Sequence, residues 1–152
     1  MNFTVIGGGL MGSGIGQVAA QAGYKVTIID VSNEALEKAQ DRISLSVKKF
    51  AQKNIIPNEE EVLSNLRFST NWDPISKANV IIEAVPERLE LKKETFKRLN
   101  QLAKPDCLLA TNTSSLSITN IASVTSRPEK VIGMHFFSPV PMMPLLELVR
   151  GY

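Results

Sequence analysis

A glycine-rich turn near the first residue constrains the fold more than any other feature of this sequence. The segment Gly7–Gly12 fits the pattern G-x-G-x-x-G, follows the strand-like run Phe3–Ile6 and opens the helical pattern Met11–Ala22. In such a turn the first glycine permits a tight bend, the second lets a pyrophosphate approach the backbone, and the third lets the helix pack on the strand. The helix N-terminus attracts the anion. The residues predicted to contact a dinucleotide here are Gly7, Gly9, Leu10, Met11 and Gly12.

An aspartate about 20 residues beyond the turn narrows the choice of cofactor. Asp30 ends the second strand-like run, Lys25–Asp30, where a carboxylate can bind the ribose hydroxyls of a dinucleotide. Val31 and Ser32 come next, and no arginine is at hand to hold a 2′-phosphate. This arrangement favours NAD over NADP. The alternative interpretation is a structural turn with a surface aspartate.

Short β-type runs alternate with longer helical patterns, which is typical of a parallel α/β sheet. We therefore predict one domain over residues 1–152 with a Rossmann-type fold, a doubly wound and mostly parallel sheet with helices on both faces. The predicted strands are Phe3–Ile6, Lys25–Asp30, Arg67–Thr70, Val80–Ala84, Leu108–Thr111, Val131–His135 and an edge strand at Glu147–Val149. The predicted helices are Met11–Ala22, a long helix capped at Ser32 and ending near Lys53, a short one opened by Pro57–Glu61, Leu89–Ala103 and Leu116–Val124.

The composition argues against several classes of protein. A formal net charge of +2 is too small to suggest a nucleic-acid or membrane-surface partner. No apolar run approaches the roughly 20 residues that span a bilayer, and the first residues lack the features of a signal peptide, so we expect a cytoplasmic protein. The single cysteine, Cys107, lies in an apolar run and is predicted to be an inert core residue. No metal site is predicted.

The single histidine lies where a parallel sheet binds its ligands. His135 is at the carboxyl end of a predicted strand, beside the expected nicotinamide site. Oxidation of an alcohol by hydride transfer requires a base for the hydroxyl proton, and imidazole titrates near neutral pH. A carboxylate should orient this base and stabilise the imidazolium, and Glu147 on the following strand is the candidate. The alternatives are a structural histidine and a surface glutamate.

Four segments of the sequence resemble the 3-hydroxyacyl-CoA dehydrogenase family. They are GGGLMGSGI at 7–15, IEAVPE at 82–87, ATNTSSL at 110–116 and GMHFFSPV at 133–140. The likeness runs in register through essentially all 152 residues. It implies the N-terminal NAD-binding domain of the family. In the family a helical domain of comparable size follows, carries the subunit contact of a dimer, and is missing from this chain.

The resemblance also implies an activity and roles for three residues. The expected reaction is the NAD-dependent oxidation of an L-3-hydroxyacyl-CoA to the 3-ketoacyl-CoA, or its reverse, as in fatty-acid β-oxidation. His135 would be the base, Glu147 its partner, and Ser114 would bind the reacting oxygen. A structural alternative for Ser114, or for Ser115, is capping of the predicted helix that follows. Because the family's catalytic asparagine comes from the helical domain, the isolated domain should bind NAD(H) but be poorly active.

Further positions match the family's binding residues. Glu87 and Lys92 match contacts to the cofactor, although composition alone suggests a solvated helix face. Ser46 and Lys53 match positions that hold the coenzyme A part of the substrate, and an ammonium near its phosphates is physically reasonable. Surface lysines are common on helices, so a plain surface role stays open for this pair.

Two positions depart from the family pattern. Ser138, near the expected nicotinamide, is asparagine in many single-function members and serine in multifunctional fatty-acid oxidation proteins. Serine still donates and accepts a hydrogen bond, so Ser138 remains a predicted cofactor contact. Pro144 stands where a lysine is common. These departures affect the subgroup more than the activity.

Two other interpretations remain open at this point. One is a dehydrogenase of the 6-phosphogluconate or 3-hydroxyisobutyrate type, which uses a lysine of its helical domain and needs no histidine at this strand end. The other is a non-catalytic NAD-binding module, crystallin-like or a sensor, which should keep the glycine turn and lose the catalytic pair. The presence of both His135 and Glu147 argues against each of them.

Overall fold

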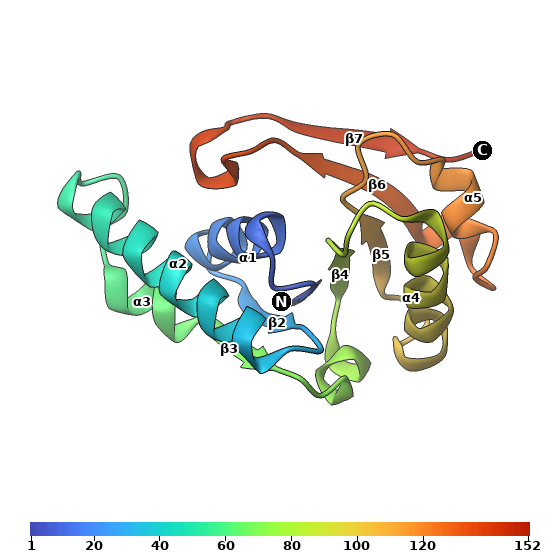
Figure 1. Ribbon diagram of the computed structural model, residues 1–152, viewed down its shortest axis with the longest axis horizontal. Helices are drawn as coiled ribbons and strands as arrows, with labels where there is room; N and C mark the ends of the chain where they lie inside the picture. The colour runs from blue at the N-terminus through green and yellow to red at the C-terminus, as the bar shows by residue number, and fades with distance from the viewer.

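One sheet of seven strands forms the centre of the computed structural model, which describes residues 1–152 (Figure 1). The strand order is β3-β2-β1-β4-β5-β6-β7; the first six strands run parallel, and β7 pairs antiparallel with β6. This topology confirms the predicted Rossmann-type class. The strands are β1 Asn2–Ile6, β2 Lys25–Ile29, β3 Leu66–Ser69, β4 Val80–Glu83, β5 Leu108–Thr111, β6 Val131–Phe136 and β7 Leu146–Arg150.

Helices cover both faces of the sheet and bury a separate core on each (Figure 1). Because successive side chains of a strand point to opposite faces, Val5 of β1 belongs to one core and Ile6 to the other. The helices are α1 Leu10–Gln21, α2 Asn33–Gln52, α3 Glu59–Ser64, α4 Leu89–Leu102 and α5 Ile118–Ala122. Three short 3-10 helices lie in the connections between these elements: η1 Asp73–Lys77, η2 Pro128–Lys130 and η3 Val140–Met142. None of the helices is both long and apolar enough to cross a membrane.

Three of the helices, α2, α3 and α5, begin at a side-chain cap. The Ser32 hydroxyl accepts a hydrogen bond from the backbone N–H of Ala35, so the predicted cap of α2 is confirmed. The cap of α5 differs from the prediction, because Ser117 accepts from Asn120 N–H and the helix is shorter than expected. A capping role for Ser114 or Ser115 is therefore wrong.

The cysteine is a core residue, as predicted. Cys107 is fully buried between α4 and β5. Burial raises the pKa of its thiol to about 11, and the nearby Arg127 and Lys104 offset this only in part. At neutral pH the side chain is therefore an uncharged thiol within the core.

Candidate active site

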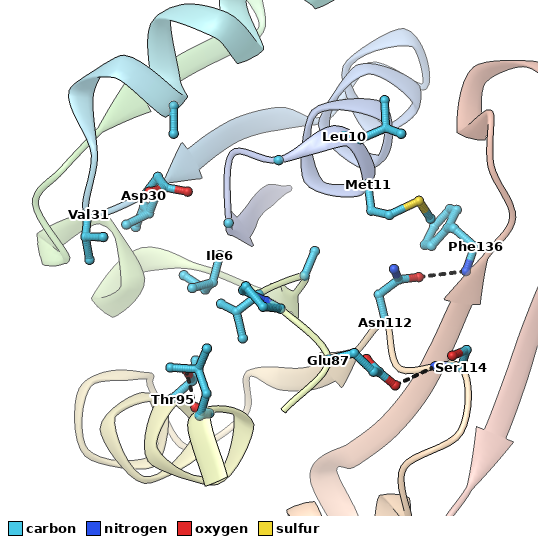
Figure 2. Close-up of a pocket in the computed structure, with 18 of the residues that line it drawn as sticks. Ile6, Leu10, Met11, Asp30, Val31, Glu87, Thr95, Asn112, Ser114 and Phe136 are labelled. Carbon is cyan, nitrogen blue, oxygen red and sulfur yellow. Dashed lines mark hydrogen bonds between the residues drawn. The ribbon is translucent and has the colours of Figure 1, made fainter. Parts of the chain in front are cut away.

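A cavity of about 1000 Å³ opens along the carboxyl edge of the sheet, where the loops after β1, β2, β4, β5 and β6 converge (Figure 2). It brings together residues that are far apart in the sequence, as expected for a ligand site in an open parallel sheet. The predicted site residues that line it are Gly7, Gly9, Leu10, Met11, Asp30, Glu87, Ser114, His135 and Ser138. The predicted site residues that do not line it are Gly12, Lys92, Glu147, Ser46 and Lys53.

The glycine turn has the geometry that the sequence predicts. Gly7 has a φ of +111°, and a Cβ there would lie 2.7 Å from the carbonyl oxygen of Ala84. A Cβ on Gly12 would lie 1.8 Å from the carbonyl oxygen of Gly7, so only glycine lets α1 start this close to β1. A Cβ on Gly9 would meet nothing within 4 Å, because this residue faces open space in the cavity. The backbone at Gly9 is therefore open to a ligand.

Asp30 anchors the same turn from the end of β2. Its Oδ2 accepts a hydrogen bond of 2.7 Å from the backbone N–H of Gly8, and its Oδ1 accepts one of 3.0 Å from that of Ser32. A carboxylate has about four acceptor positions, so ribose hydroxyls could still donate to it. The structure also brings Arg98 of α4 to this cavity, a cationic neighbour that the local sequence around Asp30 does not show.

His135 and Glu147 form a pair across β6 and β7. The two residues lie opposite each other in the antiparallel register, and Nδ1 of His135 is 3.1 Å from Oε2 of Glu147. The imidazole is only 19% exposed, whereas the carboxylate is 56% exposed. The Phe137 ring packs against the imidazole, with centroids 4.4 Å apart. Because Nδ1 faces the carboxylate, Nε2 is the ring nitrogen without a hydrogen bond to the protein.

The loop after β5 is held at the cavity by hydrogen bonds to its neighbours (Figure 2). Asn112 Oδ1 accepts from the backbone N–H of Phe136 at 2.8 Å, which ties the loop to the strand of His135. The Thr113 hydroxyl and the backbone N–H of Ser114 both donate to Oε1 of Glu87. Neither Asn112 nor Thr113 is predicted from the sequence as a site residue. The signal that could have identified them is their place beside Ser114 in the segment ATNTSSL.

Lys92 lies in the interior rather than on a solvated helix face. Its side chain is 1% exposed, and its Nζ is 2.7 Å from Oε1 of Glu83 and 3.4 Å from Oε2 of Glu87. Glu83, at the end of β4, is completely buried and also accepts hydrogen bonds from Thr111 Oγ1 and Val85 N–H. The alternative of a solvated helix face is thus wrong for Lys92, because a buried Glu83 carboxylate is stabilised by a cation beside it.

The two carboxylates on either side of Lys92 are perturbed in opposite directions. Burial raises the pKa of Glu83, and the Lys92 ammonium opposes this only in part. Burial alone would also raise the pKa of Glu87, but the Thr113 hydroxyl, the Lys92 ammonium and the Ser114 N–H together lower it. Glu87 is therefore ionised at neutral pH and fixes the start of the Ser114 loop.

The predicted coenzyme A contacts lie away from this cavity. Ser46 Oγ accepts a hydrogen bond of 2.9 Å from Gln17 of α1, so its hydroxyl lies between α1 and α2. Lys53 is the exposed residue that follows the last turn of α2. Neither residue lines the cavity that contains His135.

Comparison with known proteins places this site in a family. Residues 2–152 match the family described as 3-hydroxyacyl-CoA dehydrogenase, NAD binding domain. The chain belongs to the 3-hydroxyacyl-CoA dehydrogenase family. NAD is therefore its cofactor, and the match decides against a dehydrogenase of the 6-phosphogluconate or 3-hydroxyisobutyrate type.

Individual members of the family are similar over the whole chain. The 3-hydroxybutyryl-CoA dehydrogenase of Clostridioides difficile is 45% identical over 99% of this chain and 54% of its own length. The mitochondrial hydroxyacyl-coenzyme A dehydrogenase of Rattus norvegicus is 43% identical over 98% of this chain and 50% of its own length. The chain thus spans about half the length of these curated relatives.

Solved structures of the family have the same fold. The (S)-3-hydroxybutyryl-CoA dehydrogenase of Ralstonia eutropha superimposes with a TM-score of 0.95 at 36% identity, over 99% of this chain and 54% of that one. The 3-hydroxybutyryl-CoA dehydrogenase of Escherichia coli gives a TM-score of 0.94 at 41% identity, over 97% of this chain and 32% of that one.

The residues of the cavity fit an NAD molecule. Gly9 leaves the backbone of the turn open, and Asp30 offers free acceptor positions at one end. His135 and Ser138 line the other end. When bound, NAD would be held by the turn, Asp30 and these strand ends.

Proposed function

We propose that the protein containing this chain oxidises an L-3-hydroxyacyl-CoA to the 3-ketoacyl-CoA with NAD, or catalyses the reverse reaction. One observation supports this proposal more strongly than the others. His135 lines the same cavity as the glycine turn and has a carboxylate, Glu147, 3.1 Å from its Nδ1. A non-catalytic NAD-binding module would not need this pair.

The roles of the residues follow from the chemistry of an alcohol. NAD supplies the acceptor for the hydride that leaves carbon 3 of the substrate. His135 takes the hydroxyl proton on Nε2, so that one hydride and one proton leave together and a carbonyl remains. Glu147 holds the ring through Nδ1 and stabilises the imidazolium. Ser114, at the cavity rim, donates a hydrogen bond to the reacting oxygen.

The proposal also includes a site for coenzyme A and a contact with a second domain. Ser46, between α1 and α2, and Lys53, the exposed residue that follows α2, would hold the coenzyme A portion, with the ammonium near its phosphates. Leu146, Leu148 and Val149 of β7 are exposed apolar side chains at the open edge of the sheet. A helical domain of the kind found in the family would pack on them, contribute a catalytic asparagine and form a dimer.

A direct assay tests the proposed reaction. The full-length protein should oxidise NADH, followed by its absorbance, when acetoacetyl-CoA is present and much more slowly with free acetoacetate. The 152-residue chain alone should be at least about 100-fold slower per site, because a preorganised donor and the exclusion of water would be missing. Absence of turnover in the full-length protein would contradict the proposal, as would unchanged turnover in the chain alone.

Asp30 should give the site its preference for NAD(H) over NADP(H). A carboxylate facing a 2′-phosphate is repulsive, and we expect about a thirtyfold weaker affinity for NADPH, equivalent to about 2 kcal/mol. Replacement with alanine or asparagine should weaken NADH binding and narrow this gap. Titration calorimetry measures both dissociation constants. Asp41→Asn, at an exposed position of α2, is the control and should leave them unchanged. Equal affinities in the unaltered chain would contradict the role of Asp30.

A further inference from the structure

A stacked arginine and tryptophan lie in the cavity but take no part in the proposed chemistry. The Cζ atom of Arg98 is 3.9 Å from the centroid of the Trp72 ring, and both side chains line the cavity. Trp72 follows β3 and packs on the core beneath α4, so its ring is supported from behind. The guanidinium makes no ion pair with a carboxylate of the chain. Instead, it lies over one face of the aromatic ring.

The pair lies at the Asp30 end of the cavity. β3 is the neighbour of β2 in the sheet, so Trp72 and Asp30 follow adjacent strand ends. Arg98 is one helical turn after Thr95 on the face of α4 that lines the cavity. Figure 2 shows Thr95 on the same side as Asp30 and Val31, away from Asn112 and Ser114. The apolar residue Val31 is 86% exposed here and is available to cover one side of a bound ring.

Charge at this end favours a base over a phosphate. Asp30 and Glu94 line the same cavity as Arg98, so two carboxylates accompany the one guanidinium. A 2′-phosphate would be repelled by them. A flat aromatic base carries no net charge and can stack on a guanidinium plane.

We propose that Arg98, held flat by Trp72, is the platform on which the adenine ring of the cofactor stacks, with Val31 covering the opposite side. Arg98 is thus a specificity-determining residue for the adenosine half of NAD. The inference rests on NAD binding by this chain and not on proton transfer by His135.

The test compares ligands that contain or lack adenine. ADP-ribose and NADH should each bind about tenfold more weakly to Arg98→Ala, in the range expected for the loss of one base stack. Arg98→Lys should lose nearly as much, because it keeps the charge and loses the plane. The inhibition constant of nicotinamide mononucleotide, corrected for the NADH affinity of each variant, should be the same in all of them. The unaltered chain should also show a change in emission of Trp72, its single tryptophan, on binding ADP-ribose.

Two further variants complete the experiment. Lys97→Ala removes a charge from the adjacent exposed position of α4, outside the cavity, and should leave ADP-ribose affinity unchanged. Trp72→Leu should weaken ADP-ribose binding about threefold, because Arg98 loses its support. Full ADP-ribose affinity in Arg98→Lys would overturn the stacking role. An Arg98→Ala variant that binds only NADPH more weakly, and ADP-ribose as before, would also overturn it. If the full-length protein binds ADP-ribose normally but shows no turnover, only the proposed function is contradicted.

Discussion

Replacement of Lys92 with methionine is expected to lower the free energy of unfolding by about 3 to 5 kcal/mol. Methionine fills a similar volume, so the loss comes from the carboxylate that remains. Glu83 is completely buried and would keep only its hydrogen bonds from Thr111 and Val85. Urea unfolding, followed by circular dichroism, measures the change. Lys97→Met, at an exposed position of the same helix, should change stability by less than about 0.5 kcal/mol.

The fall in the free energy of unfolding caused by Lys92→Met should grow as pH rises. Burial raises the pKa of Glu83 above its ordinary value, and removal of the Lys92 ammonium should raise it further. When an acid has a higher pKa in the folded state than in the unfolded chain, the folded protein loses stability as pH rises through the folded-state pKa. The destabilisation by Lys92→Met should therefore be larger at pH 8 than at pH 5. The double variant with Glu83→Gln should recover much of the stability. A loss below about 1 kcal/mol at pH 8 would show that Lys92 does not stabilise a charged Glu83.

Replacement of His135 with alanine should reduce turnover of the full-length protein by about 100-fold or more, because the hydroxyl proton loses its acceptor. The dissociation constant for NADH should change little, since the glycine turn and Asp30 are untouched. Turnover with acetoacetyl-CoA and NADH fluorescence measure the two quantities separately. Glu129→Gln, at an exposed position of η2 before the start of β6, is the control and should leave both unchanged.

Coupling to Glu147 tests whether the pair acts as a unit. Glu147→Gln removes the carboxylate that faces Nδ1 and should reduce turnover on its own. The double variant with His135→Ala should raise the activation free energy by less than the sum of the two single variants, because the carboxylate acts through the imidazole. If His135→Ala keeps most of its turnover, the proposed proton transfer is wrong.

The parts of this fold that could be predicted from sequence depend on local signals. The Gly7–Gly12 turn, the Ser32 cap and the alternation of strands and helices each act within a few residues, and all are confirmed. His135 and Glu147 are brought together by the pairing of two neighbouring strands, so their contact also follows from short-range order.

The remaining features depend on contacts between distant segments. Lys92 looks like a surface lysine, because nothing nearby in the sequence shows that α4 covers the buried end of β4. Arg98 and Trp72 meet only because α4 packs beside the turn that follows β3. The hydrogen bond from Thr113 to Glu87 likewise joins the loops of two strands. Such contacts come from the packing of the whole sheet, which periodicity alone does not specify.

Titration of the 152-residue chain with NADH tests the central claim most directly. The turn, Asp30 and the strand ends that line the cavity all belong to this chain, so binding requires no other segment. We expect a saturable rise in NADH fluorescence with one site per chain, reversed by NAD and abolished by Gly12→Val, whose side chain would collide with the carbonyl oxygen of Gly7. A folded chain that shows no saturable binding of NADH would contradict the account.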